Sequence, residues 1–330
     1  MPPSAKRAAV PASPAAERSP VAALVVLVVV LIMALVGVDL LVLGRNNPAT
    51  VLVPHDYMVL GDSLSFGYQP NLDFSSGFAD DIFHDLQKAN VTSLVNYACA
   101  GESTQTMIDG GCPGRFLHHG SYTGPQLQAA IDFVKSERNR GRVSPITLEI
   151  GSNDVINDWN ASTCSPNANA SADLARMDAN LTRVILPELL NALGSSTKAG
   201  NGDLHMLNYY NPYAKECSGS AQFIHTLNNH LQADAAQFRV PVVDVYTAFG
   251  GDANMASHIC QYTWICNARF HDIHPTNLGY QVIAHAVEVT LGLPGNAPLP
   301  SMPGIVPASG WAIPSLGAAF RRQFDAARVA

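Results

Sequence analysis

Charged side chains are scarce in this chain: only 14% of its 330 residues are Asp, Glu, Lys or Arg, and the formal net charge is −7. The chain lacks the clustered positive charge that binds phosphates, so we predict no nucleic-acid partner. Cys-x-x-Cys pairs are also missing, which argues against a zinc ribbon and a thioredoxin-like redox site. By contrast, 47% of the residues are hydrophobic, which is enough for a substantial core.

Six cysteines are present, and their even number favours three disulfides if the chain works in an oxidising compartment. Proximity along the sequence favours the pairs Cys99–Cys112, Cys260–Cys266 and, from the remaining two, Cys164–Cys217. The alternative is six buried thiols in a reducing compartment.

A long apolar segment follows the N-terminal tail. Residues 1–20 are rich in Ala, Pro and Ser, and we predict that they are disordered. Residues 21–43 are apolar except for Asp39, which is long enough for a helix that crosses about 30 Å of hydrocarbon. A signal peptide has a shorter apolar core and a small-residue cleavage site, and no such site is evident here. We therefore expect an uncleaved transmembrane signal anchor; cleavage would instead give a secreted protein.

Basic residues flank this segment unequally. Lys6, Arg7 and Arg18 precede it, whereas only Arg45 follows closely. The positive-inside tendency therefore predicts a cytoplasmic N-terminus and an extracytoplasmic remainder, which agrees with disulfide formation. Residues 45–55 are expected to form a short linker.

The remaining chain alternates between short apolar runs and segments with helical spacing. Five runs predict strands, at residues 56–62, 93–98, 146–150, 204–210 and 240–245. Helical spacing covers residues 77–88, 125–138, 172–193, 221–238 and 277–291, with a kink expected at Pro187. Strands that are apolar throughout are typical of a parallel sheet covered on both faces. We predict an α/β fold, a three-layer α/β/α domain with a mostly parallel five-stranded sheet at residues 56–292, followed by a Pro- and Gly-rich tail at residues 293–330.

The segment GDSLSFGY, residues 61–68, lies at the end of the first predicted strand. A serine at a strand-to-helix turn can expose its hydroxyl at the edge of a sheet. That hydroxyl is a poor nucleophile and needs a base within hydrogen-bonding reach. By itself, Asp62-Ser63 before a helix is more typical of a helix cap.

Three further segments carry candidate partners for Ser63. Gly101 ends NYACAG after the second strand, and Asn153 lies in GSND after the third. His274, in HDIHPTNLGY, precedes the last helix. Each has an ordinary structural alternative: a turn glycine, a cap asparagine and a loop histidine. Because the carboxyl ends of parallel strands meet at one edge of the sheet, the four together favour a single site.

Taken together, the four segments resemble the sequence blocks of the SGNH hydrolases, also called GDSL-type esterases and lipases. The resemblance covers about residues 57–291. It implies a flavodoxin-like fold, Ser63 as the nucleophile and His274 as the general base and acid. It also implies an oxyanion hole made of the Ser63 and Gly101 N–H groups and the Asn153 side-chain amide, with no cofactor.

One position departs from this pattern. The family usually has an aspartate three residues before the histidine, where this chain has His271. The orienting group fixes the imidazole tautomer and stabilises the imidazolium. Asp272 is expected to take this role, and the alternative acceptor is the main-chain carbonyl of His271. A metal site made of His271, Asp272, His274 and the nearby His258 is not expected, because HDIH has no standard ligand spacing.

Two function classes remain. The first is an extracytoplasmic serine esterase or lipase that acts on a lipid, an acylated glycan or a small ester. The second is a non-catalytic surface protein that keeps the fold and binds a glycan or lipid, which only the missing aspartate at position 271 supports. Candidate pocket aromatics, which core packing would explain equally well, are Phe66, Tyr68, Tyr122, Tyr213 and Trp264. Glycosylation motifs occur at Asn90, Asn160, Asn169 and Asn180.

Overall fold

The computed structural model describes residues 55–114, 116–136, 138–194 and 203–293. The expected N-terminal tail, membrane anchor, most of the linker and nearly all of the C-terminal tail lie outside these residues. Within the described part of the chain, no helix is long and apolar enough to span a bilayer.

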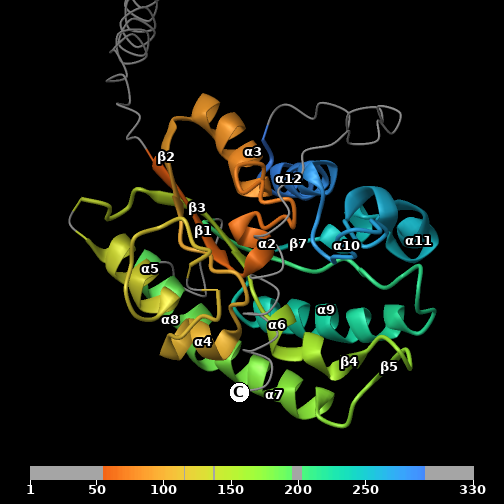
Figure 1. Ribbon diagram of the computed structural model, residues 1–330. Helices are drawn as coiled ribbons and strands as arrows, with labels where there is room; N and C mark the ends of the chain where they lie inside the picture. Colours follow the sequence, from red (N-terminus) through yellow and green to blue (C-terminus); the bar gives the residue numbers. More distant parts are fainter. Residues whose placement is uncertain (1–54, 115, 137, 195–202, 294–330) are drawn as a thin grey trace, which may run out of the picture. The chain divides into compact units, whose positions relative to one another are not determined.

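A five-stranded sheet with the order β2-β1-β3-β6-β7 forms the centre of the fold (Figure 1). All four strand pairings are parallel. This confirms the predicted parallel sheet. Its strands are β1 (His55–Gly61), β2 (Val91–Asn96), β3 (Val143–Glu149), β6 (Leu204–Leu207) and β7 (Val242–Val243).

Helices cover both faces of this sheet (Figure 1). One group contains α3 (Phe78–Leu86), α10 (Val245–Ala248), α11 (Gly251–Tyr262) and α12 (Asn277–Leu291). The other group contains α4 (Thr104–Asp109), α5 (Gln126–Lys135), α7 (Ala170–Asn180), α8 (Leu186–Leu193) and α9 (Ser220–Gln237). The shorter elements are α2 (Ser63–Phe66), α6 (Ser152–Val155), the 3-10 turns η1 (Gln87–Ala89) and η2 (Ile156–Asp158), and the hairpin strands β4 (Trp159–Asn160) and β5 (Ser165–Pro166).

The helix predicted at residues 172–193 is interrupted. It consists of α7 and α8, joined by the π-helical turn η3 (Leu181–Ile185). Pro187 lies in the first turn of α8 and has no N–H to donate to the preceding turn. The irregularity therefore lies just before the proline, where the wider turn accommodates the missing hydrogen bond.

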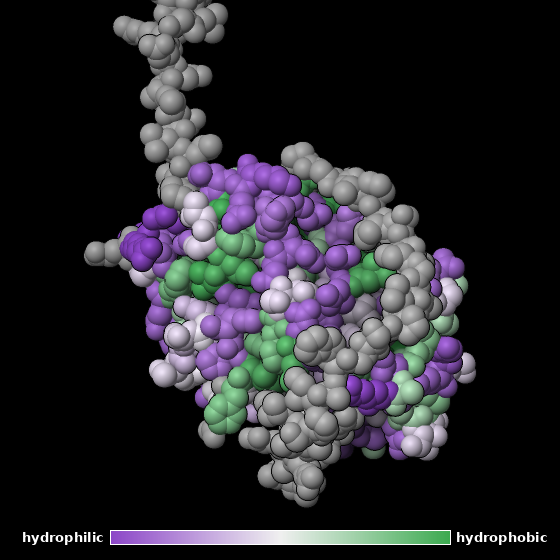
Figure 2. All heavy atoms as spheres, turned by 45° about the horizontal axis from the view of Figure 1, so that its top comes forward, coloured by the Kyte–Doolittle hydropathy of each residue, from purple (hydrophilic) through white to green (hydrophobic). Residues whose placement is uncertain are grey.

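The apolar runs of the central strands form the core. Residues 57–60 of β1 are 0% exposed. The same holds for Ile146 and Leu148 of β3 and for Ile150, which follows β3. Burial on both faces explains why these strands do not alternate between apolar and polar residues. On the face shown in Figure 2, hydrophobic residues form a few patches between hydrophilic ones.

Three disulfides join the predicted pairs Cys99–Cys112, Cys164–Cys217 and Cys260–Cys266. The first closes a loop after β2. The second ties the segment between β4 and β5 to the segment before α9. The third connects the end of α11 to the chain that leads to residue 274.

Candidate active site

Ser63 begins α2 directly after β1. Asp62 is the N-cap of this short helix and accepts a hydrogen bond from the Leu64 N–H (2.9 Å). The turn is tight, because a Cβ atom on Gly61 would lie 1.9 Å from the Glu149 carbonyl oxygen, and Gly61 has φ +131°. Glycine at position 61 therefore allows β1 to pass against β3 and to turn the serine toward the sheet edge.

His274 meets Ser63 from the other end of the chain. Its Nε2 atom lies 2.8 Å from Ser63 Oγ. The loop before α12 holds the histidine in place, because the Trp264 N–H donates to the His274 carbonyl (3.0 Å). Tyr210 follows β6, and its hydroxyl donates to the Ile273 carbonyl (2.7 Å). Elements far apart in sequence thus fix the distance between the hydroxyl and the imidazole.

Asp272 contacts the other side of the imidazole. Its Oδ1 lies 2.6 Å from His274 Nδ1 and also accepts from the His274 N–H at 2.8 Å. His271, the residue at the usual acid position, has φ +42°, and its ring lies 3.8 Å from a Glu216 carboxylate oxygen. Ser63, His274 and Asp272 therefore form a continuous chain of hydrogen bonds, a geometry that can pass a proton from hydroxyl to imidazole.

Two backbone N–H groups were predicted to form the oxyanion hole, those of Ser63 and Gly101. Gly101 adopts φ +85°, and neither its N–H nor that of Ser63 is bonded to another described residue. The amides on either side of Gly101 are bonded: the Ala100 N–H to Leu117 (3.2 Å) and the Glu102 N–H to Cys99 (3.0 Å). These two N–H groups are therefore available to donate to a substrate oxyanion.

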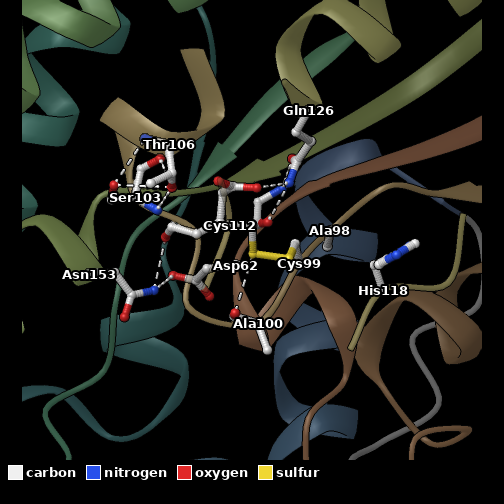
Figure 3. Close-up of a disulfide and its surroundings, with 12 residues drawn as sticks. Asp62, Ala98, Cys99, Ala100, Ser103, Thr106, Cys112, His118, Gln126 and Asn153 are labelled. Atoms are coloured by element: carbon white, nitrogen blue, oxygen red, sulfur yellow. Dashed lines mark hydrogen bonds between the residues drawn. A yellow bond between two sulfur atoms is a disulfide. The ribbon is translucent and has the colours of Figure 1, made fainter. Parts of the chain in front are cut away.

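Asn153 is close to the site, but its amide is engaged. Nδ2 donates to Asp62 Oδ2 (3.1 Å) and to the Glu102 carbonyl (3.0 Å). Figure 3 shows Asn153 beside Asp62, near the Cys99–Cys112 disulfide. Both N–H bonds of Asn153 are therefore used, and the amide would have to give up one of them to donate to a substrate.

The family model described as GDSL-like lipase/acylhydrolase matches residues 57–287. The chain belongs to this family. It is therefore a carboxylic ester hydrolase, which confirms the resemblance found in the sequence.

Several solved structures are similar to this acylhydrolase. The lipase Lip_vut3 from a goat rumen metagenome is 18% identical, with a TM-score of 0.48, over 72% of this chain and 98% of its own. The α/β hydrolase LAE5 from the Lake Arreo metagenome is 17% identical, with a TM-score of 0.45, over 73% and 98%. The acetylxylan esterase Axe2 from Geobacillus stearothermophilus is 14% identical, with a TM-score of 0.46, over 72% and 94%. No curated protein matches the chain.

Buried polar residues also support the site of this acylhydrolase. The sequence motifs did not indicate them. Gln126 of α5 accepts from the Gly61 N–H (2.7 Å) and donates to the Gly61 carbonyl (3.0 Å) and to Glu102 Oε2 (3.0 Å). Burial raises the pKa of Glu102 to about 7. Glu149, at the end of β3, is also buried, and desolvation raises its pKa well above the usual range. The sequence signal for a buried carboxyl group was the glutamate inside the apolar run ITLEI, because glutamate is seldom fully buried.

Tyr68 is the predicted pocket aromatic that contacts the histidine. Its ring centroid lies 4.5 Å from that of His274, in an edge arrangement. Phe66 and Tyr68 also belong to a small apolar cluster separate from the main core, together with Phe74, Ala98, Ala100 and Leu117. Apolar side chains thus flank the Ser63 helix and the Gly101 loop.

The other predicted aromatics have partners elsewhere. Tyr122 packs on Tyr97, and Tyr213 stacks on Trp159. The Trp264 ring N–H donates to Gln69 (3.2 Å).

The four residues considered as metal ligands do not surround one point: Asp272 and His274 contact each other, but the other two have different partners. His258 Nδ1 lies 3.3 Å from the Phe249 carbonyl, and His271 points toward Glu216. Among the described residues, the group whose atoms are close enough to share an ion is Cys99, Glu102 and Cys112, and the two sulfurs form a disulfide.

Proposed function

We propose that this chain is a membrane-anchored, extracytoplasmic serine esterase that works through an acyl-enzyme. The observation that carries the proposal is the hydrogen-bonded chain from Ser63 through His274 to Asp272, with distances of 2.8 and 2.6 Å. The serine and the histidine come from segments separated by 211 positions.

In the first half-reaction, His274 Nε2 takes the proton of Ser63 as Oγ attacks the ester carbonyl carbon. Asp272 keeps Nδ1 protonated and stabilises the imidazolium. Negative charge develops on the carbonyl oxygen, where the Ser63 and Gly101 N–H groups donate to it. His274 then protonates the leaving alcohol, and the acyl group remains on Ser63.

In the second half-reaction, water replaces the alcohol. His274 takes a proton from water, the hydroxide oxygen attacks the acyl carbon, and the Ser63–acyl bond breaks. His274 returns its proton to Ser63 Oγ, and the carboxylic acid leaves. Asn153 is the third oxyanion donor, and it exchanges one of its two present hydrogen bonds for the substrate oxygen.

The direct test is turnover of a p-nitrophenyl ester by the full chain and by Ser63→Ala. We expect turnover in the parent protein and its near-complete loss in the variant. A serine-directed phosphonate should inactivate the parent protein over time and leave one adduct on Ser63, visible by mass spectrometry. Ser65→Ala is the matched control, because Ser65 Oγ is buried and donates to the Leu60 carbonyl (3.0 Å). Undiminished turnover in Ser63→Ala would refute the proposal.

The acyl preference follows from a series of p-nitrophenyl esters from acetyl to palmitoyl. The apolar cluster around Phe66 and Tyr68 favours an acyl chain longer than acetyl. A maximum at acetyl would instead favour small esters or acetylated glycans. Binding of a glycan or lipid without turnover of any ester would favour the non-catalytic alternative.

The location rests on residues 21–43 and the six cysteines. Cells producing the full chain should retain it in the membrane fraction through a carbonate wash, whereas a variant lacking residues 1–44 should not be retained. In intact cells, external protease should digest the catalytic domain. Recovery of the full chain as a soluble protein of the cytosol would contradict the anchor.

A further inference from the structure

Two buried carboxyl groups lie side by side behind Ser63. Asp62 is 0% exposed and Glu149 is 1% exposed. Asp62 directly follows β1, and Glu149 is the last residue of the neighbouring strand β3, where it pairs with Gly61. The Asp62 N–H donates to the Glu149 carbonyl (3.1 Å), which brings the two residues together, and each carboxyl affects the pKa of the other. Glu149 has no part in the reaction steps given above.

A hydrogen bond between these two carboxyls would require a shared proton. Two ionised carboxylates offer only acceptor atoms, so they form a hydrogen bond only when one of them is protonated. Asp62 accepts from the Leu64 N–H (2.9 Å), Ser152 Oγ (2.9 Å) and Asn153 Nδ2 (3.1 Å). The Tyr209 hydroxyl and the Ser65 N–H are near the Glu149 carboxyl, but neither Glu149 oxygen receives a hydrogen bond of good geometry from the described residues. The negative charge therefore belongs on Asp62 and the proton on Glu149.

The electrostatic environment also favours the proton on Glu149. Burial raises the pKa of both carboxyls, and the adjacent charge of Asp62 raises that of Glu149 further. The hydrogen bonds that Asp62 accepts favour its ionised form. Glu149 is therefore the member that stays protonated at neutral pH.

The ionised Asp62 links two parts of the reaction centre. Through the Leu64 N–H it fixes the turn that begins with Ser63, and through Nδ2 it holds the Asn153 amide. When Asn153 turns one N–H toward a substrate oxyanion, its other N–H can keep the bond to Asp62. Loss of the shared proton would place two repelling charges in one buried space, and a second proton would remove the attraction for the amide.

We propose that Glu149 is a positioning residue: its carboxylic acid donates a hydrogen bond to Asp62, and the single charge of this pair holds the Ser63 turn and the Asn153 amide in the reactive arrangement. The inference rests on the proposed function, since it concerns the same site.

Other titratable groups face the pair from every side and must be separated from it in a test. Burial keeps the tyrosines neutral, because it raises their pKa values well above the usual range. Glu102 titrates nearest to neutrality, since burial raises its pKa to about 7. The neighbours are Tyr209 and Tyr210 after β6, Tyr280 of α12, His274 and Asp272 before α12, Glu102 after β2, and Asp154 of α6.

The test is the pH profile of kcat for p-nitrophenyl ester hydrolysis by the full chain, E149Q and E149L. The parent protein should lose activity at alkaline pH as the shared proton leaves. The glutamine of E149Q donates through its amide and cannot ionise, so this variant should lose the alkaline fall. The leucine of E149L has about the size of glutamate but no hydrogen-bond donor. This variant should therefore lower kcat by about 10- to 100-fold at every pH, with KM little changed. This loss is smaller than that expected for removal of an oxyanion donor.

Each result decides the proposal. Retention of the parent's alkaline fall in E149Q, or equal kcat values for E149L and E149Q, would overturn it. Infrared spectroscopy provides a readout independent of turnover. The parent protein at about pH 8 should show a protonated carboxylic acid band that E149Q lacks, because acids such as Glu102 are mostly ionised there. Absence of this band would overturn the shared proton, whereas an inactive parent protein that shows the band would defeat the proposed function alone.

Discussion

Asp272 reaches His274 although it lies two residues before the histidine rather than three. The intervening chain turns so that one carboxylate oxygen accepts from both the backbone N–H and the ring of His274. The positive φ of His271 turns the chain just before Asp272. Spacing in the sequence left the choice between this carboxylate and the His271 carbonyl open, because it depends on the path of a few loop bonds.

Asp272→Asn should lower kcat by roughly 10³- to 10⁴-fold with little effect on KM. The neutral amide cannot stabilise the imidazolium and can present its NH₂ group to Nδ1, which favours the wrong tautomer. Steady-state kinetics with a p-nitrophenyl ester measures the effect, and His271→Ala is the control. A loss below about tenfold would indicate that a main-chain carbonyl orients the ring.

Gly61→Ala should prevent folding or lower Tm by many degrees. The added Cβ would lie 1.9 Å from the Glu149 carbonyl oxygen, and this backbone cannot move without breaking the pairing of β1 with β3. Gly141→Ala is the matched control, because Gly141 also has a positive φ (+71°) but no atom within 4 Å of the new Cβ. It should cost only about 1–2 kcal/mol. Thermal unfolding of both variants, followed by circular dichroism, would disprove the steric argument if they behaved alike.

At the scale of elements, the loop between Cys99 and Cys112 connects a disulfide to the reaction centre. It contains Gly101, whose N–H is unpartnered among the described residues, and Glu102, whose carbonyl holds Asn153. The disulfide closes this loop at both ends. Two of the proposed oxyanion donors therefore depend on one covalent link.

Removal of this link by Cys99→Ala with Cys112→Ala should lower kcat by about tenfold or more, because a small displacement of donors is costly to catalysis. The chain-entropy relation gives a stability loss of about 3 kcal/mol for this loop and about 4 kcal/mol for Cys164–Cys217. The double variant at Cys164 and Cys217 should therefore unfold more easily yet keep its kcat. Urea unfolding and kinetics of both variants test this contrast, and equal kcat losses would contradict it.

The helices show where sequence patterns reach their limit. α12 has the predicted bounds, whereas α11 was not predicted. α11 starts at a glycine and contains Asp, Asn, Ser and His, which are weak helix formers. Its buried Met255, Ile259 and Tyr262 have helical spacing, and packing against the fold compensates for poor local propensity.

The same limit applies to the candidate site. The motifs around Ser63, Gly101, Asn153 and His274 could be found because each lies at the end of an element. The contacts of Gln126 with Gly61, and of the Glu149 carbonyl with the Asp62 N–H, join positions far apart in sequence. No local pattern encodes them, so only the packed structure reveals them.

For the molecule as a whole, buried carboxyls make stability depend on pH. Burial raises the pKa of Glu102 to about 7, and burial with nearby acids does the same for Asp234 and Glu288. In the unfolded chain these groups titrate near pH 4. Between about pH 4 and 7 the folded state therefore holds more protons than the unfolded state, and raising the pH favours unfolding.

We expect the free energy of unfolding to decrease from about pH 5 to about pH 8, measured by urea denaturation of the full chain. Acids with lowered pKa values, such as Asp85 beside Lys88, act at lower pH and do not oppose the trend. Glu102→Gln should make the slope shallower, whereas Asp132→Asn on the surface of α5 should not. A stability that rises over this range would show that other groups dominate.

The bond between Ser63 and His274 spans 211 positions. At typical rates of about 5–20 residues per second, a ribosome completes the histidine roughly 10–40 s after the serine. During this interval the growing chain has a hydroxyl without its base, so it cannot attack esters. The site is complete only after α12 has packed against α3 and the loop before α12 has brought the imidazole to the hydroxyl.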